Sequence, residues 1–148
     1  MGEAEAPLCW TVTRHSDVVC VREEALAFAE VQGLGRQDAW AVAIALSELM
    51  TNAVKFAGGG EVTVRLCAEA ARRGIEIVVE DRGGGIPDPE AALVDGYSEG
   101  RMLSPDFPPI ERHGLGSGLG AVRRLMDEMR IEGREGGGTR VTARRWRR

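Results

Sequence analysis

The stretch LSELMTNAVKF, residues 46–56, decides the fold of this chain. It lies in a longer run without glycine or proline, whose apolar side chains recur at helical spacing. This pattern predicts an amphipathic helix of several turns. At about 100° per residue, Glu48, Asn52, Lys55 and Phe56 fall on one stripe of that helix. Taken alone, the stripe is more typical of a solvated face with a Glu-to-Lys pairing than of a binding site.

A glycine-rich segment later in the chain favours the interpretation of this stripe as a binding site over that of a solvated face. The segment GLGSGLG, residues 114–120, lets backbone N–H groups approach an anion at a helix N-terminus, as in a phosphate cradle. It is not a Rossmann motif, because it does not follow the first strand of a βαβ unit. It is not a Walker motif either, because no Gly-Lys-Ser/Thr follows. On its own, a glycine turn that caps a helix fits the pattern equally well.

A second glycine-rich segment, DRGGG at residues 81–85, follows a predicted strand directly. The carboxylate of Asp81 can accept the amino hydrogens of adenine, and the glycines allow a flat ring to approach the backbone. An aspartate at a strand-to-turn junction is the alternative. Thr139, after three glycines at the start of the last predicted strand, either adds a hydroxyl group to this site or is an ordinary strand residue.

Length, charge and cysteines limit the class of protein. The 148 residues fit one domain that buries a core without disulfide or metal support. With 19 Lys and Arg against 23 Asp and Glu, the net charge of −4 gives no general case for nucleic acid or membrane binding. Cys9, Cys20 and Cys67 indicate reduced thiols, and no apolar stretch reaches the roughly 18 residues of a membrane helix. We therefore expect a soluble cytoplasmic protein, with the basic residues 144–148 as a solvated chain end.

Residues 1–8 are expected to be a flexible N-terminus, and residues 9–148 a single domain with a lid at about 95–113. Alternation and turn residues predict an α+β fold, a two-layer sandwich whose helices cover one face of a mixed, mostly antiparallel sheet. The first half of the chain is predicted to contain a strand at 10–13, a helix from 16–17 to about 32, and the organising helix opened by Asp38. Two strands at 61–66 and 75–80, joined by a turn at 71–74, follow. The second half is predicted to contain a short helix at 88–93, an irregular lid, a helix from 114 with inward residues to 129, and a hairpin of 130–133 with 139–143.

The motifs occur in the order found in the GHKL superfamily of ATP-binding domains, whose α/β sandwich is called the Bergerat fold, and this chain resembles that superfamily. Within it, the chain is most similar to the RsbT and RsbW type of anti-sigma regulatory serine/threonine kinases, on the RsbT side. One difference is an apparent insertion in the lid at residues 102–113. The motifs are Glu48-x-x-x-Asn52, Asp81-x-Gly83-x-Gly85, Gly114-x-Gly116-x-Gly118 and Gly138-Thr139.

The resemblance implies a role for each motif residue. Asn52 would ligate a Mg²⁺ ion that bridges the phosphates of ATP, and Glu48 would act as general base or orient the attacking hydroxyl. Lys55 matches a basic position that approaches phosphate in many histidine kinases, and a solvated lysine fits equally well. The nucleotide pocket would consist of Asp81 with Gly83, Gly85 and Thr139 around adenine, and of Gly114, Gly116 and Gly118 at the phosphates.

The leading functional hypothesis is a cytoplasmic, ATP- and Mg²⁺-dependent serine/threonine protein kinase that switches partners. Its expected partner is an antagonist protein with a STAS domain, which would carry the phosphoacceptor serine or threonine. A sigma factor or a phosphatase regulator would be a further partner. The alternative is a non-catalytic module in which ATP sets the shape that sequesters such a regulator. A third interpretation, the ATP-binding part of a histidine kinase, lacks an acceptor helix in this sequence.

Overall fold

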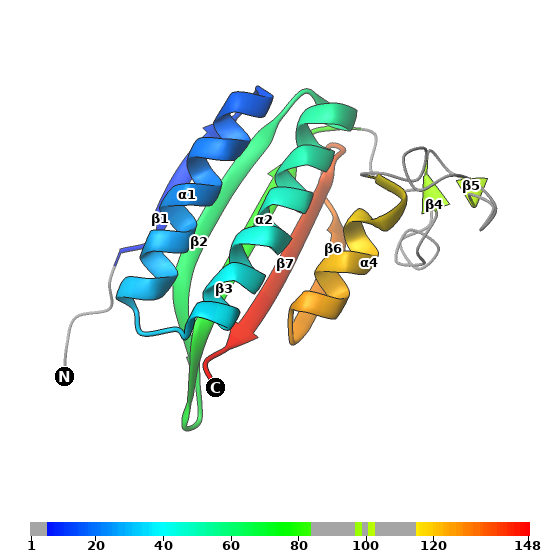
Figure 1. Cartoon of the computed structure of the whole chain (residues 1–148). Coiled ribbons are helices and arrows are strands. Elements are labelled where there is room, and N and C mark those ends of the chain that lie inside the picture. Colours follow the sequence, from blue (N-terminus) through cyan, green and yellow to red (C-terminus); the bar gives the residue numbers. More distant parts are fainter. Residues whose placement is uncertain (1–5, 84–96, 99–100, 103–114) are drawn as a thin grey trace.

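The computed structural model describes residues 6–83, 97–98, 101–102 and 115–148. Within these ranges, three helices cover one face of a five-stranded sheet (Figure 1), which confirms the predicted two-layer α+β fold. The elements, labelled as in Figure 1, are β1 (Leu8–Val12), α1 (His15–Val31), α2 (Arg36–Ala57), β2 (Gly60–Glu69), β3 (Arg72–Asp81), β4 (Tyr97–Ser98), β5 (Arg101–Met102), α4 (Leu115–Leu125), β6 (Glu128–Gly133) and β7 (Thr139–Trp146).

The sheet has the strand order β1-β2-β3-β7-β6, and each of its neighbouring pairs is antiparallel. The strand β3 is therefore central, and β1 lies at an edge, as predicted. The helix α2 packs between α1 and α4 over the middle of the sheet (Figure 1). Among the described residues, none of the helices combines the length and apolarity needed to cross a lipid bilayer.

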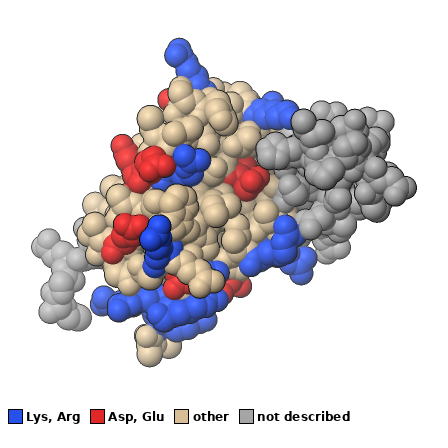
Figure 2. All heavy atoms as spheres, viewed as in Figure 1, with Lys and Arg blue, Asp and Glu red and all other residues tan. Residues whose placement is uncertain are grey.

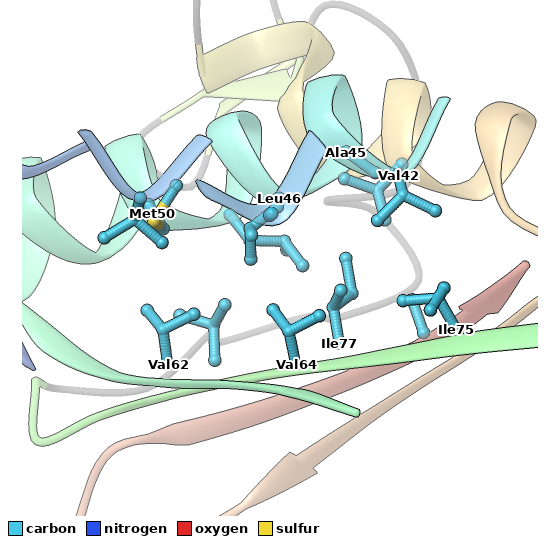
Figure 3. Close-up of a cluster of buried hydrophobic side chains, with 14 of the residues drawn as sticks. Val42, Ala45, Leu46, Met50, Val62, Val64, Ile75 and Ile77 are labelled. Carbon is cyan, nitrogen blue, oxygen red and sulfur yellow. The ribbon is translucent and has the colours of Figure 1, made fainter. Parts of the chain in front are cut away.

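The core lies between α2 and the central strands. Figure 3 shows apolar side chains of α2 pointing toward the alternating side chains of β2 and β3, which face the helices at every second position. This confirms the alternation that the sequence predicted for both strands. The labelled core residues are Val42, Ala45, Leu46 and Met50 from α2, Val62 and Val64 from β2, and Ile75 and Ile77 from β3.

Besides Phe56 of the polar stripe, two large apolar residues of α2 lie outside the core. Trp40 is 40% exposed and Ile44 is 42% exposed, although the helical spacing counted both with the apolar residues of this helix. They lie one turn apart on the ridge of α2 that faces away from the sheet, because α1 and α4 pack against its flanks. The amphipathic spacing therefore identifies the helix, and the packing of α1 and α4 decides which of its apolar residues are buried.

The N-termini of the helices differ from the prediction in detail. The helix α1 begins at His15 after the N-cap Arg14, slightly before the predicted start at 16–17. Asp17 lies in its first turn and accepts hydrogen bonds from the backbone N–H groups of Thr13 (2.9 Å) and Arg14 (3.1 Å). In α2, the helix begins at Arg36 after the N-cap Gly35, so Asp38 does not open it. Asp38 is instead buried in the first helical turn, where Arg145, which is far away in sequence, neutralises its charge.

The prediction of a solvated chain end at 144–148 was wrong for residues 144–146, which lie in β7, whereas Arg147 and Arg148 are exposed. The strand β7 runs to Trp146, and Arg145 points to the helix side of the sheet. Its Nη2 lies 2.7 Å from Oδ1 of Asp38, and its Nη1 donates to the carbonyl of Leu125 at the end of α4 (2.6 Å). Arg145 thus ties α2, α4 and β7 together. Figure 2 shows further basic side chains on the helix face, near the C-terminal end of β7.

Other element boundaries differ from the predicted ones by a few residues. The β2–β3 turn consists of Ala70 and Ala71, where Ala70 has a φ of 53°, and it is tighter than the predicted turn at 71–74. The helix α4 ends at Leu125, and β6 begins two residues earlier than predicted. The predicted helix at 88–93 lies outside the described residues. So does most of the lid, within which β4 and β5 form a small hairpin.

Glu76 carries an ion-pair cluster on the sheet face opposite the helices. Only 2% of its side chain is exposed, and its two oxygens accept from Nε of Arg65 (2.6 Å) and Nε of Arg144 (2.7 Å). Burial alone would raise the pKa of Glu76, but these two hydrogen bonds outweigh it and hold the pKa below the ordinary glutamate value of 4.5. The strand pattern predicted only that Glu76 faces away from the core.

We expect Glu76→Gln to lower the free energy of unfolding by about 2 kcal/mol at neutral pH, because charged hydrogen bonds are lost from a buried position. The folded-state pKa lies below the unfolded one, so this stabilisation is present above about pH 4.5 and is lost as the pH falls through the folded pKa. Urea unfolding at neutral and acidic pH measures both effects. The wild type and the variant should converge at the acidic end.

The matched control is Glu132→Gln, which removes an exposed pairing with Arg130 at 3.9 Å. It should change the free energy of unfolding by less than about 0.5 kcal/mol. A loss as large as that of Glu76→Gln would contradict the view that burial makes the Glu76 cluster important.

Candidate nucleotide-binding site

The polar stripe of α2 is present as predicted. Glu48 and Asn52 are half-buried one turn apart and lie on the flank of α2 that packs against α4. Lys55 is exposed in the last turn of the same helix, and its Nζ lies 6.0 Å from the centroid of the Phe56 ring. The stripe therefore has a half-buried part, which contains the acid and the amide, and a solvent-facing part, which contains the ammonium group.

The backbone of α4 passes directly over the half-buried part. A Cβ atom added to Gly118 would lie 3.0 Å from Nδ2 of Asn52 and 3.4 Å from Oε2 of Glu48. Glycine at this position therefore brings the first turns of α4 against both polar side chains. Because the N-terminal N–H groups of a helix favour anions, this arrangement can hold a phosphate group at the N-terminus of α4, beside Asn52.

Asn52 has a property that fits a metal ligand. Its Oδ1 is buried and has no hydrogen-bond partner among the described residues. A buried carbonyl oxygen without a partner is costly, and a hard cation such as Mg²⁺ takes oxygen ligands of this type. Because Mg²⁺ usually keeps several waters and binds substrate phosphates through few protein ligands, one amide oxygen suits it when it arrives with ATP.

The predicted adenine-binding residues lie together at one end of the central strand. Asp81 is the last residue of β3, and it pairs in register with Gly60 of β2 on one side and with Thr139 of β7 on the other. Thr139 is 4% exposed. Oδ1 of Asp81 accepts from the backbone N–H of Gly83 (2.9 Å). Among the described residues, the other carboxylate oxygen has no hydrogen-bond partner, so it can accept a hydrogen bond from a ligand.

Glycines allow neighbouring segments to approach each other closely at this end of the sheet. A Cβ atom on Gly83 would lie 2.7 Å from Cβ of Ala57 at the end of α2. A Cβ atom on Gly138, whose φ is +102°, would lie 2.0 Å from the carbonyl oxygen of Asp81. No side chain fits at either position without a backbone shift. These glycines bring Asp81, α2 and the β6–β7 turn together.

The two halves of the site lie along the same helix. Asn52 and Ala57 are five residues apart in α2, which corresponds to about 7.5 Å of helix rise. A ligand with a flat ring at Asp81 can therefore place a charged tail at Asn52 and Glu48. Of the other predicted site residues, Gly116 lies in the first turns of α4, while Gly85 and Gly114 lie outside the described residues.

Sequence reasoning missed one residue that contacts this site. Nη1 of Arg134, in the turn between β6 and β7, donates to the carbonyl oxygen of Asp81 (2.8 Å). The only sequence signal was an arginine beside the three glycines at 136–138, and nothing local connects it with a strand end more than 50 residues earlier.

Gly118→Ala should separate nucleotide binding from folding. Alanine favours a helix over glycine by about 0.5–1 kcal/mol, which offsets part of the crowding against Asn52, so the melting temperature without ligand should change little. The added methyl group crowds Asn52, and overpacking of about 1–3 kcal/mol predicts a loss of ATP affinity of roughly tenfold or more. Titration calorimetry with Mg·ATP measures the loss. Gly133→Ala is the control, because its Cβ would meet nothing within 4 Å. Equal affinity of Gly118→Ala and wild type would contradict close contact of α4 with the phosphates.

Comparison with known proteins agrees with this geometry. The family model described as "Histidine kinase-like ATPase domain" matches residues 12–145. The serine/threonine-protein kinase RsbT of Bacillus subtilis is 33% identical over 138 residues, which cover 93% of this chain and 95% of RsbT. An anti-sigma F factor of Clostridium novyi is 33% identical over 102 residues, covering 68% of this chain and 65% of that factor.

Among solved structures, the mycobacterial sensor histidine kinase MprB is similar in fold. It has a TM-score of 0.53 and 20% sequence identity, and the match covers 99% of both chains. At this identity the likeness supports the fold alone, and it agrees with three helices over an antiparallel sheet. Together, the matched family model, the RsbT relative and the paired half-sites along α2 show that this chain belongs to the histidine kinase-like (GHKL) ATPase domain family.

Proposed function

We propose that this chain is an ATP- and Mg²⁺-dependent serine/threonine protein kinase that acts as a partner-switching regulator. Its substrate would be a STAS-domain antagonist protein with an acceptor serine or threonine. The observation that carries the proposal is a contact of three groups. They are Oδ1 of Asn52, which has no hydrogen-bond partner in the described part of the chain, the neighbouring Glu48, and the backbone of Gly118 against both. Similarity to RsbT over nearly the whole chain supports the kinase class.

In the proposed complex, the adenine amino group donates to the carboxylate of Asp81, and the phosphates lie between Asn52 and α4. Asn52 would hold a Mg²⁺ ion through Oδ1, and the ion would supply neutralisation of phosphate charge. Lys55, which is exposed one turn beyond Asn52, is placed to attract the phosphates from solvent. Thr139, buried opposite Asp81, supports the purine side of the pocket.

The chemical step would use Glu48. The oxygen of the acceptor hydroxyl bonds to the γ-phosphorus of ATP while the bond between that phosphorus and the β–γ bridging oxygen breaks. Glu48 accepts the hydroxyl proton or orients the hydroxyl, and ADP leaves. Its half-buried position beside Asn52 keeps the carboxylate near the phosphate end of the site.

The test is transfer of labelled phosphate from ATP to a purified STAS-domain protein, with mass spectrometry of the acceptor residue. The proposal requires a phosphoserine or phosphothreonine that depends on the chain, ATP and Mg²⁺. A second candidate function is favoured by the similarity to an anti-sigma F factor: an ATP-dependent module that sequesters a sigma factor or another regulator. A chain that binds ATP and its partner but transfers no phosphate would establish this candidate and overturn the kinase.

A further inference from the structure

We propose that Arg134 is a positioning residue that fixes the carboxylate of Asp81 and so sets the preference of the site for a 6-aminopurine. The inference rests on the proposed binding of ATP, and in particular on the recognition of adenine by Asp81. Arg134 does not belong to any of the four motifs, and its contact with the site goes through the backbone of Asp81.

The guanidinium group of Arg134 is held at both ends. Its Nη1 donates to the carbonyl oxygen of Asp81 at 2.8 Å, and its Nη2 lies 3.5 Å from Oε2 of Glu80. Glu80 is itself fixed by Nε of Arg140 at 2.8 Å. Arg134 is only 23% exposed, so its charged hydrogen bond to the carbonyl is partly shielded from water. A charge-assisted bond of this kind is roughly twice as strong as a neutral one.

The turn that carries Arg134 is shaped to deliver this contact. The backbone N–H of Arg134 donates to the carbonyl of Gly138 (3.1 Å), and the N–H of Gly137 donates to the carbonyl of Arg134 (3.0 Å). Gly136, Gly137 and Gly138 all have positive φ, which glycine adopts without strain. The turn therefore folds back onto the end of β3, and its tight geometry places Arg134 beside Asp81.

Asp81 is the point where β3 ends and the chain leaves the sheet, so its peptide lacks the support of a continuing strand. Three interactions hold it: register pairing with its strand neighbours, the bond from Gly83 N–H to Oδ1, and the bond from Arg134 to its carbonyl oxygen. The first two fix the strand and one carboxylate oxygen. The third fixes the peptide plane, and thereby the direction in which the second oxygen faces an adenine amino group.

The rival explanation is that Arg134 only stabilises the β6–β7 turn. The two roles differ in what they do to a nucleotide without an amino group. A positioning role acts through the carboxylate of Asp81, so it affects ATP and spares purine riboside triphosphate, in which hydrogen replaces the 6-amino group. A purely structural role weakens the binding of both nucleotides alike.

The experiment measures the affinity of wild type and Arg134→Gln for both nucleotides with Mg²⁺ by titration calorimetry. We expect Arg134→Gln to weaken ATP binding about tenfold and the binding of purine riboside triphosphate by less than about twofold. Arg134→Lys should recover part of the ATP affinity, because an ammonium group can still donate to the carbonyl. The matched control is Arg130→Gln, which removes an exposed ion pair with Glu132 and touches neither Asp81 nor Glu80, and which should leave both affinities unchanged.

A double-mutant cycle with Asp81→Asn completes the test. If Arg134 acts through the Asp81 carboxylate, Arg134→Gln should have little further effect on ATP binding in the Asp81→Asn background. Equal losses for both nucleotides, or an undiminished loss in that background, would overturn the role of Arg134 while leaving ATP binding intact. A wild type that binds both nucleotides equally would overturn adenine recognition by Asp81 and the inference with it. A wild type that binds neither would overturn the proposed function itself. If Arg134→Gln melts before measurement, Arg134→Lys provides the same comparison.

Discussion

Glu48→Gln is expected to reduce phosphate transfer from ATP to a STAS-domain protein by about a hundredfold or more. Glutamine keeps the size of the side chain and its hydrogen-bonding capacity, but it cannot accept the proton of the attacking hydroxyl. Affinity for Mg·ATP should stay within about twofold, because Asn52, Gly118 and Asp81 carry the proposed binding contacts. Single-turnover transfer of labelled phosphate, together with calorimetry of ATP binding, separates the two effects.

The control for this prediction is Glu30→Gln, the same chemical change at an exposed position of α1. It should leave both transfer and binding unchanged. Transfer by Glu48→Gln at the wild-type rate would exclude Glu48 as the base, and a proportional loss of ATP affinity would instead make it a binding residue.

Mg·ATP is expected to raise the melting temperature of the wild-type chain by about 5 to 10 °C at a ligand concentration a hundredfold above Kd. The reason is that a ligand specific to the folded state contributes about 2.7 kcal/mol under that condition. Asn52→Ala should lose most of this rise, because it removes the buried carbonyl oxygen that suits Mg²⁺. Removing the metal with a chelator should have a similar effect on the wild type and little on the variant.

Thr51→Ala, a half-buried neighbour of Asn52 outside the polar stripe, serves as the control and should keep the rise. Asp81→Asn should reduce the rise with or without Mg²⁺, because its contact is with the base and not with the phosphates. If the wild type melts at the same temperature with and without saturating Mg·ATP, the proposed nucleotide site is wrong as a whole.

Local sequence patterns were enough to predict the helices, strands and fold class of this protein. The run of residues around Glu48 and Asn52 has helical spacing, and the segments of β2 and β3 alternate, because side-chain direction depends on the backbone of each element alone. The same is true of the order of the motifs, which needs no three-dimensional information. For this reason the fold, the central helix and the residues of its polar stripe could be predicted from sequence.

Exposure within an element was less predictable. The helical spacing of α2 did not show which of its apolar residues would be covered, and Trp40 and Ile44 are exposed although their spacing matches that of the buried residues. The sequence of the basic C-terminal segment also did not show that Arg145 forms an ion pair with Asp38, more than 100 positions earlier in the chain. A charged side chain is buried only when a partner neutralises it, and the partner is chosen by strand register and helix packing.

By itself, then, the sequence determined which residues are proposed to bind a nucleotide and on which elements they lie. The tertiary structure decided how those residues meet: the approach of Gly118 to Asn52, the pairing of Asp81 with Thr139, and the contact of Arg134 with the Asp81 carbonyl. Each of these contacts joins segments that are far apart in the chain. Their geometry depends on sheet register and on the close backbone approach that glycine allows, and neither property can be read from local periodicity.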